Sequence, residues 1–93
     1  MKPHTITAPL EMDKDGTWYY VHVPLEVRQD FKSLEKRGII PVTARVGSST
    51  WPASLLPWAD GSAQLSIGRK IRERENLSRG QQIEVEIAPR ERA

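Results

Sequence analysis

Apolar residues recur at every second position along much of the chain, which is the period of a half-buried β-strand. The clearest case lies near the C-terminus, where Ile83, Val85 and Ile87 alternate with Glu84 and Glu86. Segments rich in β-branched and aromatic residues support the same interpretation elsewhere. The pattern predicts six strands, over residues 5–12, 17–23, 39–46, 50–56, 64–67 and 83–87.

Turn residues separate these strands. Asp15-Gly16 lies between the first two strands, so they should form a hairpin, and Asp60-Gly61 lies between the fourth and fifth. Both glycines are expected at positive φ, where an L side chain is strained. Pro41 and Pro52 interrupt two strands, and a proline that cannot donate to a ladder should lie at an edge or a bulge.

Two short segments change to a helical period. Pro24 can open a helix, and Val27, Phe31 and Leu34 follow at the spacing of one helical face, with Gly38 as the expected terminator. The second predicted helix covers about residues 69–76 and is ended by Leu77 and Gly80. The element order is therefore strand, strand, helix, strand, strand, strand, helix, strand.

This order predicts a mainly β fold with two short helices. We expect a double-split β-barrel, pseudo-twofold and built from two ββα-type halves, with the helices capping its ends. Closure into a barrel would remove the open sheet edges that such short strands otherwise expose.

Two stretches of the chain repeat the same signals at an offset of 44 residues. Val21-x-Val23-Pro24-x-x-Val27-Arg28 corresponds to Leu65-x-Ile67-Gly68-x-x-Ile71-Arg72. Each stretch continues through a leucine, an Arg-Gly pair and a strand, and the offset falls to 42 at these glycines. The order favours an internal duplication slightly over a chance likeness of two strand–helix–strand units. It places Arg28 and Arg72 at matching positions, where either capping or bracing of the barrel is expected.

Composition narrows the class of protein. With 93 residues the chain suits a single domain over 1–93, with an ordered core at about 4–88 and a tail at 89–93. Cysteine is absent, which excludes disulfides, thiolate metal sites and a cysteine nucleophile. Apolar runs are too short to span a membrane and no signal-peptide pattern is present, so we expect a cytoplasmic location.

The net charge of +2 makes this a small, mildly basic protein. Its basic residues gather in one stretch of net charge +3, which contains Arg69, Lys70, Arg72, Arg74 and Arg79. Such a cluster could track a phosphate backbone. The alternative, which we favour, is a solvated helix face, since Arg69 and Glu73 have the spacing of an i,i+4 ion pair.

Aromatic residues form the second candidate surface. Trp18, Tyr20 and His22 share one face of the second strand, and Trp58 lies in the turn region, where exposure is expected. Exposed aromatic rings can stack on bases or line a ligand groove, although packing against another sheet or a helix would explain the trio as well. Trp51, on a strand, is expected to pack in the core or at the barrel end.

Catalytic and metal-binding patterns are missing. His4 and His22 are the only histidines and have no ligand spacing around them. The Asp13-Lys14-Asp15-Gly16 run lacks the acidic ligands of a calcium loop, and the serines have no evident His and Asp partners. The sequence therefore predicts no catalytic residues, no cofactor and no metal.

The residues around the second helix carry a family resemblance. Leu65, Ile67, the basic helix start, Leu77 and Gly80 resemble the AbrB/MazE/MraZ class of swapped-hairpin proteins, which are typically dimers of one such half and bind DNA. With Gly16-x-Trp18-x-x-Val21-x-Val23-Pro24 and Ser54-Leu55-x-Pro57 before Asp60-Gly61, the whole of about 5–88 resembles the small bacterial family DUF1905. That resemblance implies a double-split β-barrel and no assigned activity. Gly68 and Gln81 depart from the family pattern at positions that concern turn geometry.

These observations lead to a functional expectation. We expect a non-enzymatic binding or interaction domain of unknown ligand, acting as a monomer or weak homodimer, without a membrane partner. Nucleic-acid binding is the first alternative and rests on the resemblance and the basic helix. A small enzyme that holds a ligand against Trp18, Tyr20 and His22 is the second.

Overall fold

The computed structural model describes residues 2–90 of the chain. Its strands are β1 His4–Pro9, β2 Glu11–Met12, β3 Tyr19–Val23, β4 Ile40–Val46, β5 Ser49–Pro57, β6 Ala63–Ser66 and β7 Gln82–Pro89. Its helices are α1 Leu25–Asp30, the 3₁₀ helix η1 Lys32–Leu34 and α2 Arg69–Arg74. The fold is mainly β with short helices, as the alternating pattern predicts.

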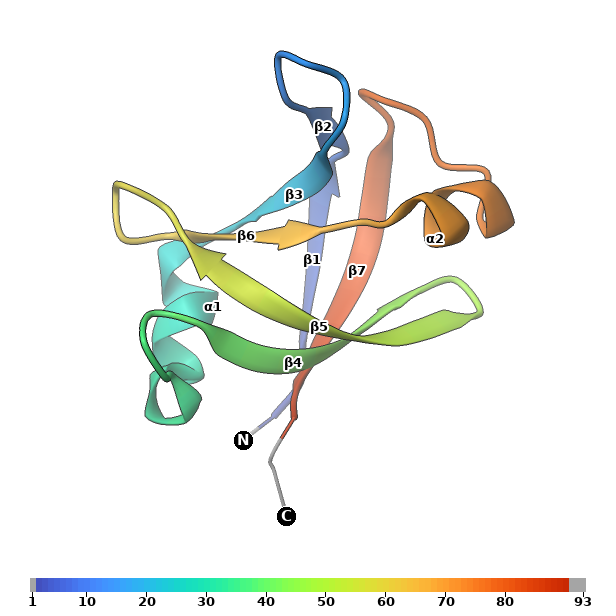
Figure 1. The fold of residues 1–93 in the computed structure, drawn as a ribbon. Helices are drawn as coiled ribbons and strands as arrows, with labels where there is room; N and C mark the ends of the chain where they lie inside the picture. The colour runs from blue at the N-terminus through green and yellow to red at the C-terminus, as the bar shows by residue number, and fades with distance from the viewer. Residues whose placement is uncertain (1, 91–93) are drawn as a thin grey trace.

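All strands join one antiparallel sheet in the order β1-β7-β4-β5-β6-β3-β2. The two outermost strands, β1 and β2, are consecutive in the chain, so the sheet curls back on itself into a nearly closed barrel (Figure 1). A barrel of this kind leaves little open sheet edge.

The junction between β1 and β2 corrects one prediction. Residues 5–12 do not form one strand paired with 17–23, because β1 pairs with β7 and only β2 pairs with β3. The break falls at Leu10, whose side chain is buried and whose backbone is bonded to Gly80 and Gln81 at 2.7 and 2.9 Å. The consecutive strands β1 and β2 therefore form the two margins of the barrel.

One apolar cluster fills the interior. Val27 and Phe31 from the α1 region meet Ile71 from α2 and Ile83 from β7 in this cluster, as the two helical stripes predict. The largest fully enclosed side chains are Phe31, Leu10, Ile40, Leu55, Leu65, Ile67 and Ile87. Both halves of the chain thus share one core.

The first helix is shorter than its apolar stripe predicts. α1 ends at Asp30 and continues only as η1 to Leu34, and Arg37 and Gly38 then have φ of 54° and 82°. These two residues turn the chain between Lys36 and Ile39, whose backbones exchange hydrogen bonds at 2.9 and 3.0 Å. Positive φ at both central residues is typical of a type I′ turn.

The second helix also ends early. α2 stops at Arg74 instead of residue 76, and Asn76 has a φ of 55°. The backbone N–H of Leu77 donates to the carbonyl of Arg72 at 2.8 Å, a closure that satisfies a free helix carbonyl. Within residues 2–90 none of the helices has the length and hydrophobicity needed to cross a lipid bilayer.

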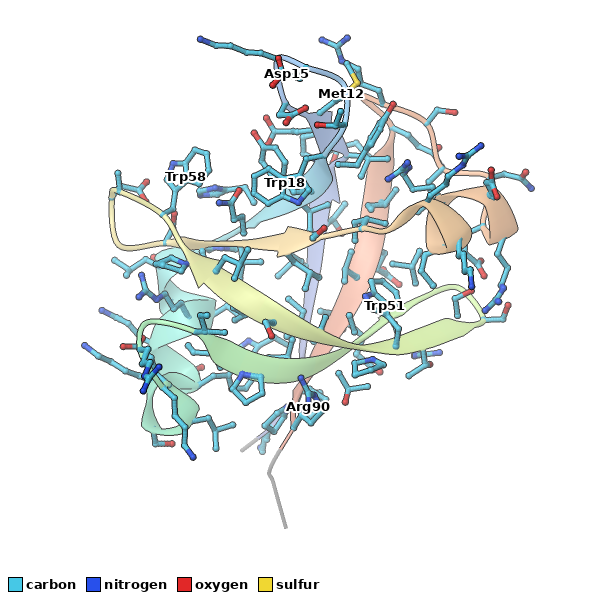
Figure 2. All side chains as sticks on the ribbon, viewed as in Figure 1. Met12, Asp15, Trp18, Trp51, Trp58 and Arg90 are labelled. Carbon is cyan, nitrogen blue, oxygen red and sulfur yellow. The ribbon has the colours of Figure 1, made fainter. Side chains whose placement is uncertain are left out.

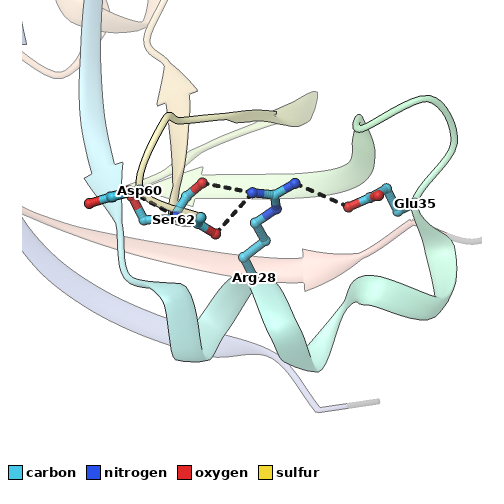
Figure 3. A network of polar contacts seen from close by, with 5 residues as sticks. Arg28, Glu35, Asp60 and Ser62 are labelled. Carbon is cyan, nitrogen blue, oxygen red and sulfur yellow. Dashed lines mark hydrogen bonds and ion pairs between the residues drawn. The ribbon is translucent and has the colours of Figure 1, made fainter.

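Arg28 ties α1 to the neighbouring loop between β5 and β6 (Figure 3). Its guanidinium donates to the carbonyls of Gly61 and Ser62 at 2.9 and 3.0 Å and to the carboxylate of Glu35 at 3.3 Å. The side chain is mostly buried, with 18% exposed. Arg28 therefore braces the barrel and holds the loop between β5 and β6.

The predicted tail begins later than residue 89. Pro89 still belongs to β7, where it pairs with Val42. Arg90 donates to the carbonyls of Val42 and Ala53 at 3.1 and 3.0 Å. These bonds hold the chain against β4 and β5, and residues 91–93 lie outside the described part.

Candidate functional site

Aromatic side chains cover the outer face of β3. Val21 and Val23 are fully buried, and alternation along the strand therefore turns Trp18, Tyr20 and His22 to the outside. Ring centroids of Trp18 and Tyr20 are 4.9 Å apart with an interplanar angle of 31°. The face predicted from the sequence is thus formed, and its three side chains are partly exposed.

Trp58 joins this face from the loop between β5 and β6. Its ring lies 6.1 Å from Tyr20 and 6.4 Å from His22, edge-on to the imidazole. We call Trp18, Tyr20, His22 and Trp58 the aromatic strip. Trp18 and Trp58 both project to the same side of the β3–β6 pair (Figure 2). Trp58 is 41% exposed, as its place in a turn predicts.

Hydrogen bonds fix the strip at both ends. Asp13 accepts from the backbone N–H groups of Thr17 and Trp18 at 3.0 and 3.2 Å, and the Trp18 indole donates to the Ser66 hydroxyl at 2.9 Å. At the other end, the N–H of Trp58 donates to the carbonyl of Ser62 at 3.0 Å. The Trp18 indole and the backbone at Trp58 are therefore held in place.

The loop that carries Trp58 has its own support. Gly61 has a φ of 92°, as predicted, and its N–H donates to the carbonyl of Trp58 at 3.0 Å. The Asp60 carboxylate accepts from the hydroxyl and the backbone N–H of Ser62. The Ser62 hydroxyl bond is the main reason that the pKa of Asp60 lies below its ordinary value.

A cleft opens beside the strip, where β5 and β6 separate. The ladder between them covers only Leu55–Leu65, Leu56–Gln64 and Pro57–Ala63, and beyond Leu55 the two segments diverge toward α2 and the β4–β5 hairpin (Figure 1). The cleft has a volume of about 280 Å³ and is lined by Trp51, Pro52, Ala53, Ser54, Leu56, Ser66 and Gly68. We call it the β5–β6 split.

The split and the strip meet at Ser66, which lines the split and bonds Trp18. Between them lies Gln64, which is directly opposite His22 on one side and Leu56 on the other. Gln64 is 7% exposed, and its buried Oε1 has no hydrogen-bond partner among the described residues. Buried acceptors are normally paired, so this oxygen is an unmet hydrogen-bonding group beneath the strip.

Carboxylates surround the strip. Glu11 lies directly opposite Tyr20 on β2 and so shares its face. Asp13 is bonded to the Trp18 backbone, and Asp60 is close enough for the charge of His22 to affect its pKa. The strip therefore has an acidic border.

The basic cluster lies elsewhere. Arg69 is ion-paired with Glu73 at 3.1 Å, as its i,i+4 spacing predicts. Arg72 stacks over the ring of Tyr19 at 3.8 Å and donates to the Ile67 carbonyl at 2.8 Å. The remaining cations, Lys70, Arg74 and Arg79, are exposed, and α2 lies at the far end of β6 from Trp58. The structure thus separates the two predicted surfaces.

Arg28 and Arg72, which the internal repeat aligns, make different contacts. Arg28 reaches the loop ahead of β6, whereas Arg72 returns to the residue two positions before its own helix. Both brace the fold, as predicted, by dissimilar means. The duplication itself stays a prediction.

The two histidines are separated. His4 contacts Asp30 at 2.8 Å and packs edge-on against Phe31, near α1. His22 belongs to the aromatic strip. Among residues 2–90 no three His, Cys, Asp or Glu side chains come together in a group that could hold a metal ion.

Trp51 lies between the core and the β5–β6 split, a feature that the sequence pattern did not predict. Trp51 packs against the core as predicted and also lines the split, on its β5 side (Figure 2). The split was not predicted, because alternation marks strands without giving their partners. Pro52 and Gly68 were the available signal, since both residue types disfavour ladder pairing.

A family model matches most of the chain. The model, DUF1905, is described as a domain of unknown function and matches residues 7–87. A search of curated proteins found no match. The expected relation to the DNA-binding swapped-hairpin proteins stays a prediction.

Proposed function

The chain belongs to the DUF1905 family, a domain of unknown function, and we propose from its geometry that it is a non-enzymatic binding domain whose ligand lies across the aromatic strip. The observation that carries the proposal is the contact between Trp58 and the rings of β3, which come from distant parts of the sequence. Tryptophan and tyrosine are the residues that most often dominate the energy of binding surfaces.

The strip is suited to binding because it is already ordered. Binding costs free energy whenever side chains must be fixed, and here Trp18 is fixed by Ser66 and Asp13. The loop of Trp58 is held by Asp60 and Ser62 and, through its carbonyls, by Arg28. A ligand would therefore bind to aromatic side chains that are already fixed, and little binding free energy would be lost in ordering them.

The contacts of His22 favour binding over catalysis. A general base usually needs a third group to orient it. In the described part of the chain His22 has no side-chain hydrogen bond, and the nearby carboxylate of Asp60 is bonded to Ser62. The imidazole instead contributes its edge contact with Trp58.

A fluorescence screen tests the proposal. Tryptophan emission of the full chain would be followed during titration with a capped Arg-Val peptide, a capped Glu-Val peptide, decathymidylate and cellohexaose. At least one probe should bind, and Trp58→Ala should weaken that binding at least tenfold. Truncation of a central aromatic contact commonly costs 2 kcal/mol or more, or about thirtyfold.

The matched control is Ile39→Ala. Ile39 is 42% exposed, like Trp58, and lies in the turn before β4, outside the four residues of the strip. This variant should bind each probe as the wild type does. Binding that survives Trp58→Ala but is lost in Lys70→Ala with Arg74→Ala would contradict the proposal and place the ligand on α2.

A further inference from the structure

The aromatic strip lies in an acidic part of a basic chain. Residues 11–23 and 57–66 carry the strip and the strands β2, β3 and β6, and they contain four carboxylates but one cation, Lys14. The whole chain has a net charge of +2, so this region is opposite in sign to the rest. A charged ligand of the strip is therefore expected to be a cation. The four carboxylates are Glu11, Asp13, Asp15 and Asp60.

Two of these carboxylates border the rings directly. Glu11 lies opposite Tyr20 in the β2–β3 ladder, and side chains of directly opposite residues project from the same face. Asp60 follows Trp58 by two positions in the loop between β5 and β6. Both hydrogen bonds from Ser62 end on its Oδ1, so neither of them uses Oδ2. Carboxylate oxygens thus border the strip beside Tyr20 and beside Trp58.

The rings of the strip form a row and not a cage. The rings of Trp18 and Tyr20 are tilted by 31° from one another, and so are those of Tyr20 and Trp58. His22 stands across the row, at 87° to Trp58. Quaternary ammonium groups are recognised in cages of aromatic rings, whereas a planar guanidinium stacks on a single ring face. The row therefore favours a flat cation.

Leu25 extends this surface beyond the strip. Its side chain is 40% exposed and lies beside Gly61, in the loop that carries Trp58, because a methyl group added to Gly61 would be 3.5 Å from Leu25 Cδ1. A small ion on the strip would leave Leu25 and the exposed part of Trp58 in water, whereas the surface of a protein would cover both. Aromatic and arginine side chains are enriched where proteins meet.

We propose that the aromatic strip and Leu25 form a docking surface for a partner protein, which lays the guanidinium of one arginine on the rings. This inference rests on the proposed function, because it names the ligand of that surface. The arginine stacks on a ring face and donates in its own plane to the bordering carboxylates. The chain makes such a stack internally, where Arg72 lies 3.8 Å from the ring centroid of Tyr19. Nucleic acid is a poorer occupant, because its phosphates would meet the same carboxylates.

The first test follows tryptophan emission of the full chain during titration with four peptides that differ at one position. They are Ac-LPGRGPL-NH2 and its forms with lysine, trimethyllysine or citrulline in place of arginine. Lysine and trimethyllysine keep the charge without the planar group, and citrulline keeps the planar group without the charge. The arginine form should bind at least fivefold more tightly than the other three. Equal binding of any of them, or no binding of the arginine form at about 10 mM, would overturn the inference.

A second test separates a partner protein from a small guanidine compound. N-acetylarginine N-methylamide should bind at least tenfold more weakly than the arginine peptide, whose leucines cover Leu25 and Trp58. Leu25→Ala should weaken the peptide several-fold and leave the small amide unchanged. Ile39→Ala, at a similarly exposed position, should affect neither. Equal binding of the peptide and the amide would exclude a partner protein as the occupant.

Charge-matched variants test the carboxylates. Glu11→Gln should weaken the arginine peptide several-fold, whereas Glu73→Gln on α2 removes the same charge and should not. Asp13 and Asp60 stay unchanged in this test, because they hold the backbone at the two ends of the strip. Equal loss in both variants would mean that the net charge of the chain attracts the peptide, and would contradict a contact beside Tyr20.

Failure of the inference is distinguishable from failure of the proposed function. Binding of decathymidylate or cellohexaose that is lost in Trp58→Ala, without binding of the arginine peptide, would reject the inference and retain the proposed function. Peptide binding that is unaffected by both Trp58→Ala and Trp18→Ala would reject the strip as the ligand surface and so overturn both.

Discussion

The indole N–H of Trp18 donates to the hydroxyl of Ser66 at 2.9 Å, across 48 residues of sequence. Trp18 belongs to the aromatic strip and Ser66 to the β5–β6 split, so this bond makes one surface of two features. A ligand that uses either feature meets the other. The hydrogen bond also fixes the indole, which would otherwise be free to rotate over β6.

Phe31, the residue that follows α1, is the largest fully buried side chain of the protein's described part. It is fully enclosed in the core, so Phe31→Ala should lower the free energy of unfolding by about 3–5 kcal/mol. Urea denaturation checks this value. Ile39→Ala, at an exposed position, should cost less than about 0.5 kcal/mol. A loss below about 1 kcal/mol for Phe31→Ala would contradict the placement of this region against the core.

Two arginine–glutamate pairs should differ in their effect on stability. Arg28 is 18% exposed and donates to two carbonyls and Glu35, so Arg28→Ala should cost about 1.5–3 kcal/mol. Arg69 is 82% exposed, and Arg69→Ala should cost at most about 0.5 kcal/mol. Urea denaturation of both variants gives the comparison. Equal costs would show that the Arg28 network does not brace the barrel.

Glu75 should make the fold sensitive to acid. The hydroxyl of Ser49 donates to its carboxylate and lowers the pKa of Glu75 below the ordinary value of 4.5. A lowered pKa means that the unfolded state binds more protons, so this contribution is complete above pH 4.5 and is lost as the pH falls through the folded-state pKa.

Denaturation between neutral and acid pH tests this dependence. Ser49→Ala should flatten the fall in stability below pH 4.5, and Ser48→Ala, whose bond to Glu75 is longer at 3.3 Å, should flatten it less. Asp60 has a lowered pKa as well, so some acid sensitivity should remain in both variants. A Ser49→Ala profile identical to that of the wild type would refute the role of this bond.

Replacement of Gly47 and Gly80 by alanine should separate two causes of lost stability, backbone strain and a steric clash. Both have positive φ, 58° and 85°, but a side chain at Gly47 would collide with the Glu75 carboxylate, whereas the space at Gly80 is open. Gly80→Ala should cost roughly 1–2 kcal/mol from backbone strain, and Gly47→Ala should cost more. Thermal denaturation of the two variants ranks their losses of stability. When Glu75 is also replaced by alanine, the additional loss of stability caused by Gly47→Ala should vanish. An unchanged additional loss would mean that another contact causes it.

Local signals predicted the elements well, because alternation and turn residues act over a few positions. Val42, Ala44 and Val46 face the core as expected, and Gly16 has a positive φ of 75°. Strand partners depend on distant contacts, so the break of the first strand at Leu10 was not foreseen. The ends of the helices also differ from the prediction, since α1 stops at Asp30 and α2 at Arg74.

The site was predicted in part. Trp18, Tyr20 and His22 share a face because of strand alternation, which the sequence displays directly. The contacts of Tyr20 and His22 with Trp58 required the pairing of β3 with β6, and the split required the early end of the β5–β6 ladder. Neither the β3–β6 pairing nor the end of the β5–β6 ladder is encoded in a local pattern.

The most direct test of the binding surface is a nitrogen–proton NMR titration of the full chain with whichever probe binds in the fluorescence screen. We expect shifts in the indole signals of Trp18 and Trp58, with little change in the backbone amides of Arg74 and Arg79. Shifts confined to the α2 residues, with both indole signals unmoved, would contradict this expectation.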